Sequence, residues 1–482
     1  MITLDKFYIN GEWVAPAAPK MMPVLTPSTN AQVGTVALGN EVDVDRAVAA
    51  SKAAFETFSM TTKAERLALL RRLADVTKAR LGDLAAAITM EMGAPATMSR
   101  ESQAQSGLGH LESFIAALEA HDEEETLPNG DIVSYEPIGV CGLITPWNWP
   151  VNQIALKVVP ALATGSTCVL KPSEHTPLSA RIYAELIHEA GYPAGVFNLV
   201  FGDGISVGSA LSKHPDVAMM SFTGSTRAGS AVSRDAAATI KRVTLELGGK
   251  SPNVIFADCD VDAAVAEGVS SCFDNTGQSC NAPTKMLVER SVYARALDVA
   301  RKTAEATKVD DPMVEGDHIG PLFDRLQYER VQAMIQKGLE EGSTLLAGGL
   351  GRPDGLAKHL QTGWFARPTI FSDVTPDMSV WREEIFGPVL IIAPFDTEDE
   401  AIAMANDTEY GLDAYLSTGD EARAMRVSRR LRAGGIHING RASDYGSPFG
   451  GFKQSGNGRE GGKFGLEDYV EVKVRPPFAQ WP

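Results

Sequence analysis

The sequence predicts an α/β protein with two domains, each built on a mainly parallel sheet whose strands alternate with helices. Between Gly139 and Ala257, short apolar runs such as TCVLK and VAMMSF are separated by helix-like segments such as LSARIYAELIHEA. This alternation is typical of parallel βαβ units. After residue 280 a second series of runs (KMLVE, PTIF, PVLIIAPF and LDAYLST) again alternates with helical segments. A chain of 482 residues is also long enough to divide into domains.

The first part of the chain is expected to begin with two helices, at residues 44–58 and 63–89, where apolar residues recur at helical spacing. The alternation in GDIVSYEP, together with Pro137, predicts an exposed hairpin before a buried strand. The runs GVCGLIT, VFNLVFG and PNVIFA predict further buried strands of the first series.

The composition argues against several classes of protein. A formal net charge of −17 disfavours a nucleic-acid binder, which needs clustered Lys and Arg. No stretch reaches the roughly 18 apolar residues of a membrane span, and no signal peptide is evident, so a cytoplasmic protein without a membrane partner is expected. The five cysteines form no C-x-x-C pair and the eight histidines no H-x-x-x-H pattern. Neither a disulfide framework nor a metal site is therefore predicted.

Polar or glycine-rich segments follow four expected strands of the first sheet: PWNWP (146–150), KPSEHTP (171–177), GDG (202–204) and TGSTRAG (223–229). Ligands of open α/β sheets bind beyond the carboxyl ends of the strands, so these segments predict a binding edge.

The last of these segments begins a helix with Gly224 and Ser225, and free backbone N–H groups there would suit a pyrophosphate. A glycine at such a turn also has a purely steric explanation. Lys171 and Glu174 would suit ribose hydroxyls, or they form a surface ion pair.

Cys280 lies in NTGQSCNAPTK, among small and polar residues that offer little apolar surface. This setting suits an accessible thiolate nucleophile, although a free cysteine is often a small buried hydrophobe. Glu246, at the end of an apolar run, is a candidate general base, or else it pairs with Lys250. The side-chain amide of Asn148 is a candidate donor to an oxyanion, or a turn residue between two prolines.

The motifs PWNWP, KPSE, FTGST, LELGGKSP, GQSC, EEIFGPV and SPFGGFKQSGNGRE occur in this order between FYINGEWV and GLEDYVEVK. In this order the chain resembles the NAD(P)-dependent aldehyde dehydrogenase superfamily. The resemblance implies a Rossmann-like dinucleotide-binding domain at residues 1–119 and 138–248 and a catalytic domain at 249–450. It also implies a small oligomerisation arm of β-strands at 120–137 and 466–482, and hence a homodimer or homotetramer.

The resemblance further implies NAD(P)-dependent oxidation of an aldehyde to a carboxylic acid. Cys280 would attack the aldehyde carbon, while its backbone N–H and the side chain of Asn148 hold the oxyanion. Glu246 would activate the water that hydrolyses the thioester. Lys157 and Glu460 are implied to lie on the path of the proton.

The cofactor implied is NAD, with NADP possible, because the carboxylate of Glu174 would repel a 2′-phosphate that Lys171 and Ser173 would partly accommodate. The residues implied to hold it are Thr145, Pro146, Trp147, Lys171, Ser173, Glu174, Gly204, Gly224, Ser225, Leu247, Glu384 and Phe386.

The residues expected to contact the aldehyde are Trp149, Gln153, Leu156, Asn281, Arg441 and Tyr445. Leu156 argues against a betaine aldehyde, which would need a full aromatic cage. Arg441, with Tyr445, would bind a substrate carboxylate, or else it faces solvent. We therefore predict a medium-chain aliphatic or an ω-oxo-carboxylic aldehyde.

Two other functions remain as alternatives. Coenzyme A instead of water would resolve the thioester in an acylating dehydrogenase, against which Glu246 argues. A non-catalytic protein would keep the fold without the chemistry. The joint presence of Cys280, Glu246 and Asn148 argues against this second alternative.

Overall fold

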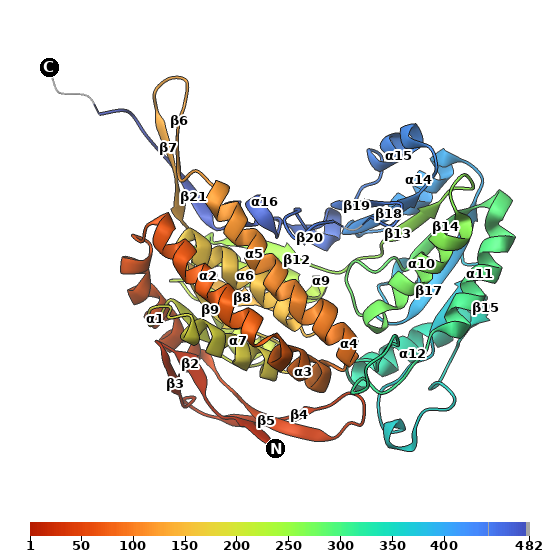
Figure 1. Cartoon of the computed structure of the whole chain (residues 1–482), viewed down its shortest axis with the longest axis horizontal. Helices are drawn as coiled ribbons and strands as arrows, with labels where there is room; N and C mark the ends of the chain where they lie inside the picture. The colour runs from red at the N-terminus through yellow and green to blue at the C-terminus, as the bar shows by residue number, and fades with distance from the viewer. Residues whose placement is uncertain (442, 479–482) are drawn as a thin grey trace.

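The computed structural model describes residues 1–441 and 443–478 and contains two large sheets, each flanked by helices (Figure 1). The eight-stranded sheet has the order β20-β12-β11-β8-β9-β10-β2-β3. The seven-stranded sheet has the order β15-β16-β17-β14-β13-β18-β19. Inner strands of both sheets pair in parallel, which confirms the predicted α/β class.

The strands of the first sheet are short and its central ones are fully buried, because helices cover the sheet. They are β2 (Phe7–Ile9), β3 (Glu12–Val14), β8 (Val140–Ile144), β9 (Thr167–Lys171), β10 (Phe197–Leu199), β11 (Met219–Thr223), β12 (Arg242–Glu246) and β20 (Gly456–Asn457). The chain runs from β8 through β9 to β10, then crosses to the other side of β8 to form β11 and β12. The strand order thus reverses between β8 and β11, where open α/β sheets bind ligands.

The second sheet is buried on both faces. Along β17, Val389, Ile391 and Ala393 pack into one hydrophobic cluster, whereas Leu390 and Ile392 pack into another on the opposite face. The strands are β13 (Pro252–Ile255), β14 (Lys285–Glu289), β15 (Thr344–Ala347), β16 (Thr369–Ser372), β17 (Val389–Phe395), β18 (Asp413–Ser417) and β19 (Gly435–Ile438).

The helices divide between the two sheets (Figure 1). Those packed around the first sheet are α1 (Glu41–Phe58), α2 (Lys63–Ala79), α3 (Leu81–Met92), α4 (Ala96–Met98), α5 (Ala104–Ala120), α6 (Pro150–Thr164), α7 (Pro177–Glu189), α8 (Ser209–Lys213), α9 (Thr226–Ala236) and α16 (Gly462–Glu467). Those of the second are α10 (Val261–Phe273), α11 (Tyr293–Ala306), α12 (Arg325–Glu340), α13 (Ser379–Arg382), α14 (Glu398–Asn406) and α15 (Glu421–Ser428). None of the helices in the described part of the chain is long and apolar enough to cross a membrane.

Three expectations about the elements were wrong. Strands precede the first helix, three of them in a small separate sheet: β1 (Ile2–Leu4), β4 (Lys20–Leu25) and β5 (Gln32–Leu38). The single helix predicted at 63–89 breaks at Arg80, whose backbone leaves the helical region and whose guanidinium binds Asp83. Gly82, a weak helix former, is the second residue of α3. The run PNVIFA supplies β13, which belongs to the second sheet instead of the first.

A third unit projects from the first sheet beside the C-terminal segment (Figure 1). It consists of β6 (Glu124–Thr126), β7 (Ile132–Pro137) and β21 (Val470–Arg475), in the order β21-β7-β6. The hairpin predicted before the buried strand β8 is therefore present, with β6 as its first strand. Val472 and Val474 of the edge strand β21 are 66% and 61% exposed. The predicted division into domains and the role of the arm stay predictions, and residues 479–482 of the arm lie outside the described residues.

Candidate active site

Cys280 lies in a tight turn between α10 and β14. The N–H of Ala282 donates to the carbonyl of Ser279 at 3.1 Å, so Cys280 and Asn281 are the central residues of a β-turn. Cys280 is partly exposed, whereas Cys141, Cys168 and Cys272 are buried. Residue 280 is therefore more accessible than these three cysteines, as a nucleophile requires, although its sulfur is largely surrounded by protein.

The backbone before the turn is strained. Asn275, Thr276 and Gly277 have φ angles of 50°, 58° and 70°, three left-handed residues in succession. A β-branched residue is rare in this region, and such strain persists only where the surroundings enforce it. Here the hydroxyl of Thr276 donates to the carbonyl of Gly320 at 3.1 Å. A Cβ on Gly277 would lie 2.1 Å from the carbonyl oxygen of Gly387, so only glycine fits.

A buried network of amides connects this segment to Asn148. The side-chain nitrogen of Asn148 donates to the carbonyl of Gln278 at 2.9 Å, two residues before Cys280. The carbonyl of Asn148 accepts from the side chains of both Gln103 and Asn275 at 3.0 Å. Asn148 is thereby fixed beside the turn of Cys280, with its amide aimed at the same loop. An amide held in this way is a preorganised donor.

Sequence reasoning did not single out Gln103, Asn275 or Gln278. Asn275 and Gln278 stand inside the motif NTGQSC, so their amide side chains could have been predicted to lie near Cys280. Gln103 could not have been predicted in this way, because it lies 172 residues before Asn275, to which it donates at 3.2 Å.

Glu246 ends β12 with a buried carboxyl group. Among the residues that the structure describes, neither of its oxygens has a hydrogen-bond partner. Burial and the nearby carboxylate of Glu460 raise the pKa of Glu246 well above its ordinary value, against the opposing charges of Lys157 and Arg459. The alternative pairing with Lys250 is wrong for the described chain, where the Lys250 ammonium has no hydrogen-bond partner.

Lys157 and Glu460 form a buried pair in contact with this region. The ammonium of Lys157, on α6, lies 2.5 Å from a carboxylate oxygen of Glu460 and donates to the hydroxyl of Ser221 at 3.1 Å. The charges of both residues act on Glu246. The pair therefore acts on Glu246 through its charges, because no hydrogen bond joins it to the Glu246 carboxyl group among the described residues.

The pKa of the Cys280 thiol is raised well above its ordinary value, by burial and then by the carboxylates of Glu384, Asp413 and Glu246. The resting form is therefore the thiol, and attack on an electrophile requires that a base remove its proton.

The carboxyl ends of β8, β9 and β11 bring together polar groups that fit a dinucleotide. The ammonium of Lys171 donates to the carbonyl of Pro172 at 2.9 Å and to the carboxylate of Glu174 at 3.0 Å. Lys171 is buried at 3% exposure, so the alternative of a surface ion pair does not describe this lysine. The pair presents a donor and an acceptor of the kind that ribose hydroxyls need.

The turn after β11 leads directly into α9. Ser225 is the N-cap of α9, and its hydroxyl accepts from the N–H of Ala228 at 3.3 Å. The other N–H groups of the first turn are available to an anion. Gly229 packs so closely on Leu247 that a Cβ would lie 2.7 Å from its side chain. This close contact places the start of α9 beside the end of β12. Gly224, which directly follows β11, therefore lies next to Glu246.

Other residues expected to hold the cofactor line the same edge. Thr145 and Pro146 directly follow β8, and the hydroxyl of Thr145 is buried without a partner among the described residues. Ser173 is buried beside Lys171. A Cβ on Gly204 would meet no atom within 4 Å, so the chain leaves open space at this position.

Glu384 and Phe386 approach from the second sheet. The carboxylate of Glu384 accepts from the N–H of Gly249 at 3.0 Å, and burial raises its pKa. Phe386 has a left-handed φ of 59° and meets Trp147 edge to face, with ring centroids 5.7 Å apart. Trp147 in turn stacks on Phe323 at 4.3 Å. Two aromatic side chains from different sheets thus meet at the predicted cofactor edge.

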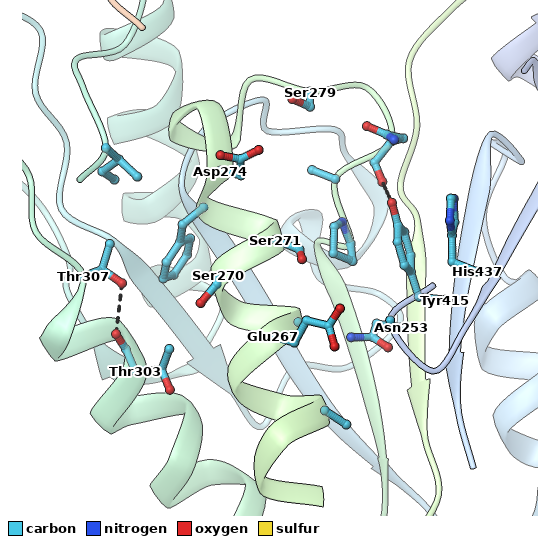
Figure 2. A pocket seen from close by; sticks show the side chains of 18 of the residues that line it. Asn253, Glu267, Ser270, Ser271, Asp274, Ser279, Thr303, Thr307, Tyr415 and His437 are labelled. Carbon is cyan, nitrogen blue, oxygen red and sulfur yellow. Dashed lines mark hydrogen bonds between the residues drawn. The ribbon is translucent and has the colours of Figure 1, made fainter. Parts of the chain in front are cut away.

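The expected substrate residues fall into three places. Trp149, Asn281 and Arg441 line a cavity of about 760 Å³, which Figure 2 shows from close by; Ser279 and Ala282 of the turn also line it, whereas Cys280 itself does not. Gln153 and Leu156 are buried on α6.

Tyr445 does not line this cavity. It packs on α5, with its ring 4.9 Å from that of His110, and a Cβ on Gly109 would lie 2.4 Å from its ring.

The indole N–H of Trp149 donates to the hydroxyl of Ser279 at 2.9 Å, which fixes this side chain beside the turn of Cys280.

Comparisons with known proteins agree with one family. The model of the aldehyde dehydrogenase family matches residues 13–475. A 3-succinoylsemialdehyde-pyridine dehydrogenase of a Pseudomonas species is 51% identical over 470 residues, covering 97% of this chain and 98% of the relative.

Solved structures give the same result. The crystal structure of an aldehyde dehydrogenase from Bartonella henselae has a TM-score of 0.96 at 48% identity, covering 98% of this chain and 99% of that one. A mutant of aldehyde dehydrogenase C from Pseudomonas syringae, in complex with NAD+ and octanal, has a TM-score of 0.96 at 47% identity, covering 99% and 98%.

Proposed function

Since the chain belongs to the aldehyde dehydrogenase family, and is thus an NAD(P)-dependent aldehyde dehydrogenase, we propose that it forms its carboxylic acid product through a thioester on Cys280. The observation that carries this proposal is the hydrogen bond from Asn148 to the carbonyl of Gln278, at 2.9 Å. It ties an amide donor to the loop that presents the thiol.

The first step is attack by the sulfur of Cys280 on the aldehyde carbon. A C–S bond forms, the carboxylate form of Glu246 takes the thiol proton and would release it through Lys157 and Glu460 before the second step, and the carbonyl oxygen becomes an oxyanion. The side-chain amide of Asn148 and the backbone N–H of Cys280 hold that charge. NAD, when bound, supplies the acceptor for the hydride that leaves this carbon.

The second step is hydrolysis of the thioester. Glu246 takes a proton from water, the hydroxide adds to the carbonyl carbon, and the C–S bond breaks to return the sulfur of Cys280. The raised pKa of Glu246 supports this role, because its carboxylate is a stronger base than that of an ordinary glutamate. Lys157 and Glu460 would carry the proton onward. Glu246 as a general base would favour water over coenzyme A as the acceptor.

The cofactor proposed is NAD rather than NADP. Lys171 and Glu174 would bind the adenosine ribose, and the start of α9 at Gly224 and Ser225 would bind the pyrophosphate. Glu384 would bind the second ribose. The carboxylate of Glu174 supports NAD, because a 2′-phosphate would meet its charge. Solved relatives from Pseudomonas syringae and Bacillus cereus are NAD+ complexes.

The proposed substrate is an aldehyde with an unbranched chain of several carbons. Octanal is bound in the solved relative from Pseudomonas syringae, and the Pseudomonas relative is named for a semialdehyde. Gln153 and Leu156 lie on the buried helix α6 that follows Asn148, and Leu156 provides apolar surface. An ω-oxo-carboxylic aldehyde is the second candidate. It is favoured by Arg441, an exposed residue that lines the cavity.

NADH formation at 340 nm with a panel of aldehydes tests the function. The panel holds short and medium aliphatic aldehydes, aromatic aldehydes and semialdehydes, each with NAD and with NADP. Cys280→Ala should abolish turnover. Cys259→Ala is the matched control, because Cys259 is also partly exposed but lies between β13 and α10, outside the turn of Cys280. Turnover by the Cys280→Ala enzyme at the rate of the wild type would refute the thioester.

A homodimer or homotetramer is proposed on the edge strand β21. Its exposed Val472 and Val474 alternate with charged residues, and an unpaired apolar edge tends to pair with another strand. Light scattering after size-exclusion chromatography should give at least twice the 51.4 kDa chain mass. Replacing both valines by lysine should lower this mass, and a monomeric wild type would exclude the proposal.

A further inference from the structure

The turn that carries Cys280 is held from two sides, by Trp149 at Ser279 and by Tyr415 at Asn281. The hydroxyl of Tyr415, on β18, donates to the carbonyl of Asn281 at 3.0 Å. Figure 2 shows this bond as a dashed line from the end of the labelled Tyr415 ring. Asn281 is the second central residue of the turn, so Tyr415 fixes the peptide next to the one that carries the sulfur.

Tyr415 is itself held by an aromatic neighbour. Its ring stacks on the imidazole of His437, on the adjacent strand β19, with centroids 4.6 Å apart and planes inclined by 14° (Figure 2). The register of the two strands sets this contact, because Tyr415 and His437 are directly paired. A second bond fixes the imidazole, whose Nε2 lies 3.0 Å from the carboxylate of Asp413.

Asp413 links this stack to the thiol electrostatically. It is buried at the start of β18, and its carboxylate is one of three that act on Cys280. Burial lowers the pKa of His437, but the hydrogen bond and charge of Asp413, together with a hydrogen bond to the backbone of Arg441, raise that pKa above its ordinary value. A charged imidazolium offsets the Asp413 carboxylate, whereas a neutral imidazole leaves it uncompensated.

We propose that Tyr415 and His437 are positioning residues of the active site, which set the orientation of the Cys280 turn and neutralise the Asp413 carboxylate behind it. This inference rests on the proposed function, in which Cys280 is the nucleophile. The other charged groups near the thiol are Glu246 and Glu384. Glu267 and Arg441 line the cavity that His437 also faces.

The hydroxyl of Tyr415 is tested with Tyr415→Phe, which keeps the ring and its stacking. The expected result is a kcat lowered roughly tenfold, with KM for aldehyde changed less than about twofold, because the bond orients the nucleophile and not the substrate. Tyr293→Phe is the matched control, since the Tyr293 hydroxyl also donates to a backbone carbonyl, that of Ile392 at 3.3 Å. Equal kcat values for the two variants would overturn the role of Tyr415.

The imidazole is tested with His437→Gln by following alkylation of Cys280 with iodoacetamide across pH, using mass spectrometry of the Cys280 peptide. At pH values where His437 is protonated, loss of its positive charge should lower the alkylation rate of Cys280 by roughly threefold to tenfold, and the rates should converge at higher pH, where the imidazole is neutral. His359→Gln is the control, because the surface pair of His359 and Asp311, at 2.8 Å, lies away from the thiol. Equal alkylation rates in the two variants at low pH would overturn the electrostatic role. Alkylation needs no aldehyde turnover, so this result is independent of the proposed function, which the Cys280→Ala enzyme tests.

Discussion

The ammonium group of Lys157 lies 2.5 Å from a carboxylate oxygen of Glu460, and both side chains are almost completely buried. Withdrawing two charges from water offsets most of the attraction between them, so a buried ion pair is weak evidence for a stabilising role. The ion pair has a functional role instead, because the charges of Lys157 and Glu460 both act on the pKa of the Glu246 carboxyl group.

Removing one member of the pair should destabilise the protein strongly. Lys157→Met leaves the Glu460 carboxylate buried and unpaired, which should lower the free energy of unfolding by about 3–5 kcal/mol in urea denaturation. The double variant Lys157→Met/Glu460→Leu should recover most of this loss without recovering activity. Lys52→Met, which breaks the exposed pair with Asp216, should change stability by less than about 1 kcal/mol. A large effect at Lys52, or full activity in the double variant, would contradict this account.

The hydrolytic step should accelerate as the pH rises. Hydrolysis requires the Glu246 carboxylate, and its raised pKa means that the carboxylate forms only at higher pH than for an ordinary glutamate. The raised pKa of Cys280 acts in the same direction on the first step. We expect kcat to increase with pH through the neutral range. Glu246→Gln should lower kcat by about 10²- to 10⁴-fold and leave a single burst of NADH, seen in stopped-flow absorbance.

Glu246 should also make stability depend on pH. Because its pKa is higher in the folded than in the unfolded chain, ionisation favours unfolding as the pH rises from the unfolded to the folded value. Glu246→Gln should therefore be more stable than the wild type at pH 8, and this difference should vanish at pH 4. A melting temperature for Glu246→Gln below that of the wild type at pH 8 would show that the carboxylate is stabilised by a contact.

The sequence predicted the site residues whose neighbours in the chain indicate their role. Cys280 stood out because its neighbours are small and polar, and Glu246 because a carboxylate ended an apolar run. The supports of the site were not predictable in this way. Gln103 reaches Asn148 from a distant helical turn, and His437 reaches Tyr415 only because β19 pairs with β18 in one register. Such contacts depend on how the elements pack, which periodicity in one sequence does not specify.

In the fold, too, some elements could be predicted from the sequence and others could not. Apolar runs predicted most central strands of both sheets, since these strands are buried on both faces. The strands β1 to β5 were missed. Exposed or partly exposed residues interrupt the apolar pattern in β1, β3, β4 and β5, and β2 is buried but only three residues long. The break between α2 and α3 was missed as well, because the apolar positions continue at helical spacing across Arg80.

Glu174 should decide the preference between NAD and NADP. Glu174→Gln removes the charge that would face a 2′-phosphate, so KM for NADP should fall by roughly tenfold while KM for NAD rises. The amide keeps the size of the side chain. The exposed Glu189→Gln on α7 serves as the control. If the ratio of the two KM values is unchanged in Glu174→Gln, this carboxylate does not select the cofactor.

A side chain at Gly277 should disrupt the loop of Cys280. Its φ of 70° disfavours any L side chain, and the Cβ of an alanine would lie 2.1 Å from the backbone carbonyl of Gly387. Gly277→Ala should lower the free energy of unfolding by about 2–5 kcal/mol and also reduce alkylation of Cys280. Gly355→Ala is a fair comparison, because Gly355 has a φ of 79° with no atom near its Cβ, so only the backbone effect of about 1 kcal/mol should appear. Equal losses in the two variants would mean that the close approach to Gly387 is unimportant.

Arg441 should distinguish the two candidate substrate classes. It lines the cavity with Trp149 and Asn281, and a guanidinium binds a carboxylate through two parallel bonds. If the physiological substrate is an ω-oxo-carboxylic aldehyde, Arg441→Ala should raise KM for the semialdehyde by roughly tenfold or more and leave KM for the uncharged aldehyde of equal length unchanged. Arg325→Ala, at an exposed position on α12, controls for the loss of one positive charge. Equal relative activity of Arg441→Ala on both substrates would remove the carboxylate from the substrate class and leave the medium-chain aliphatic aldehyde.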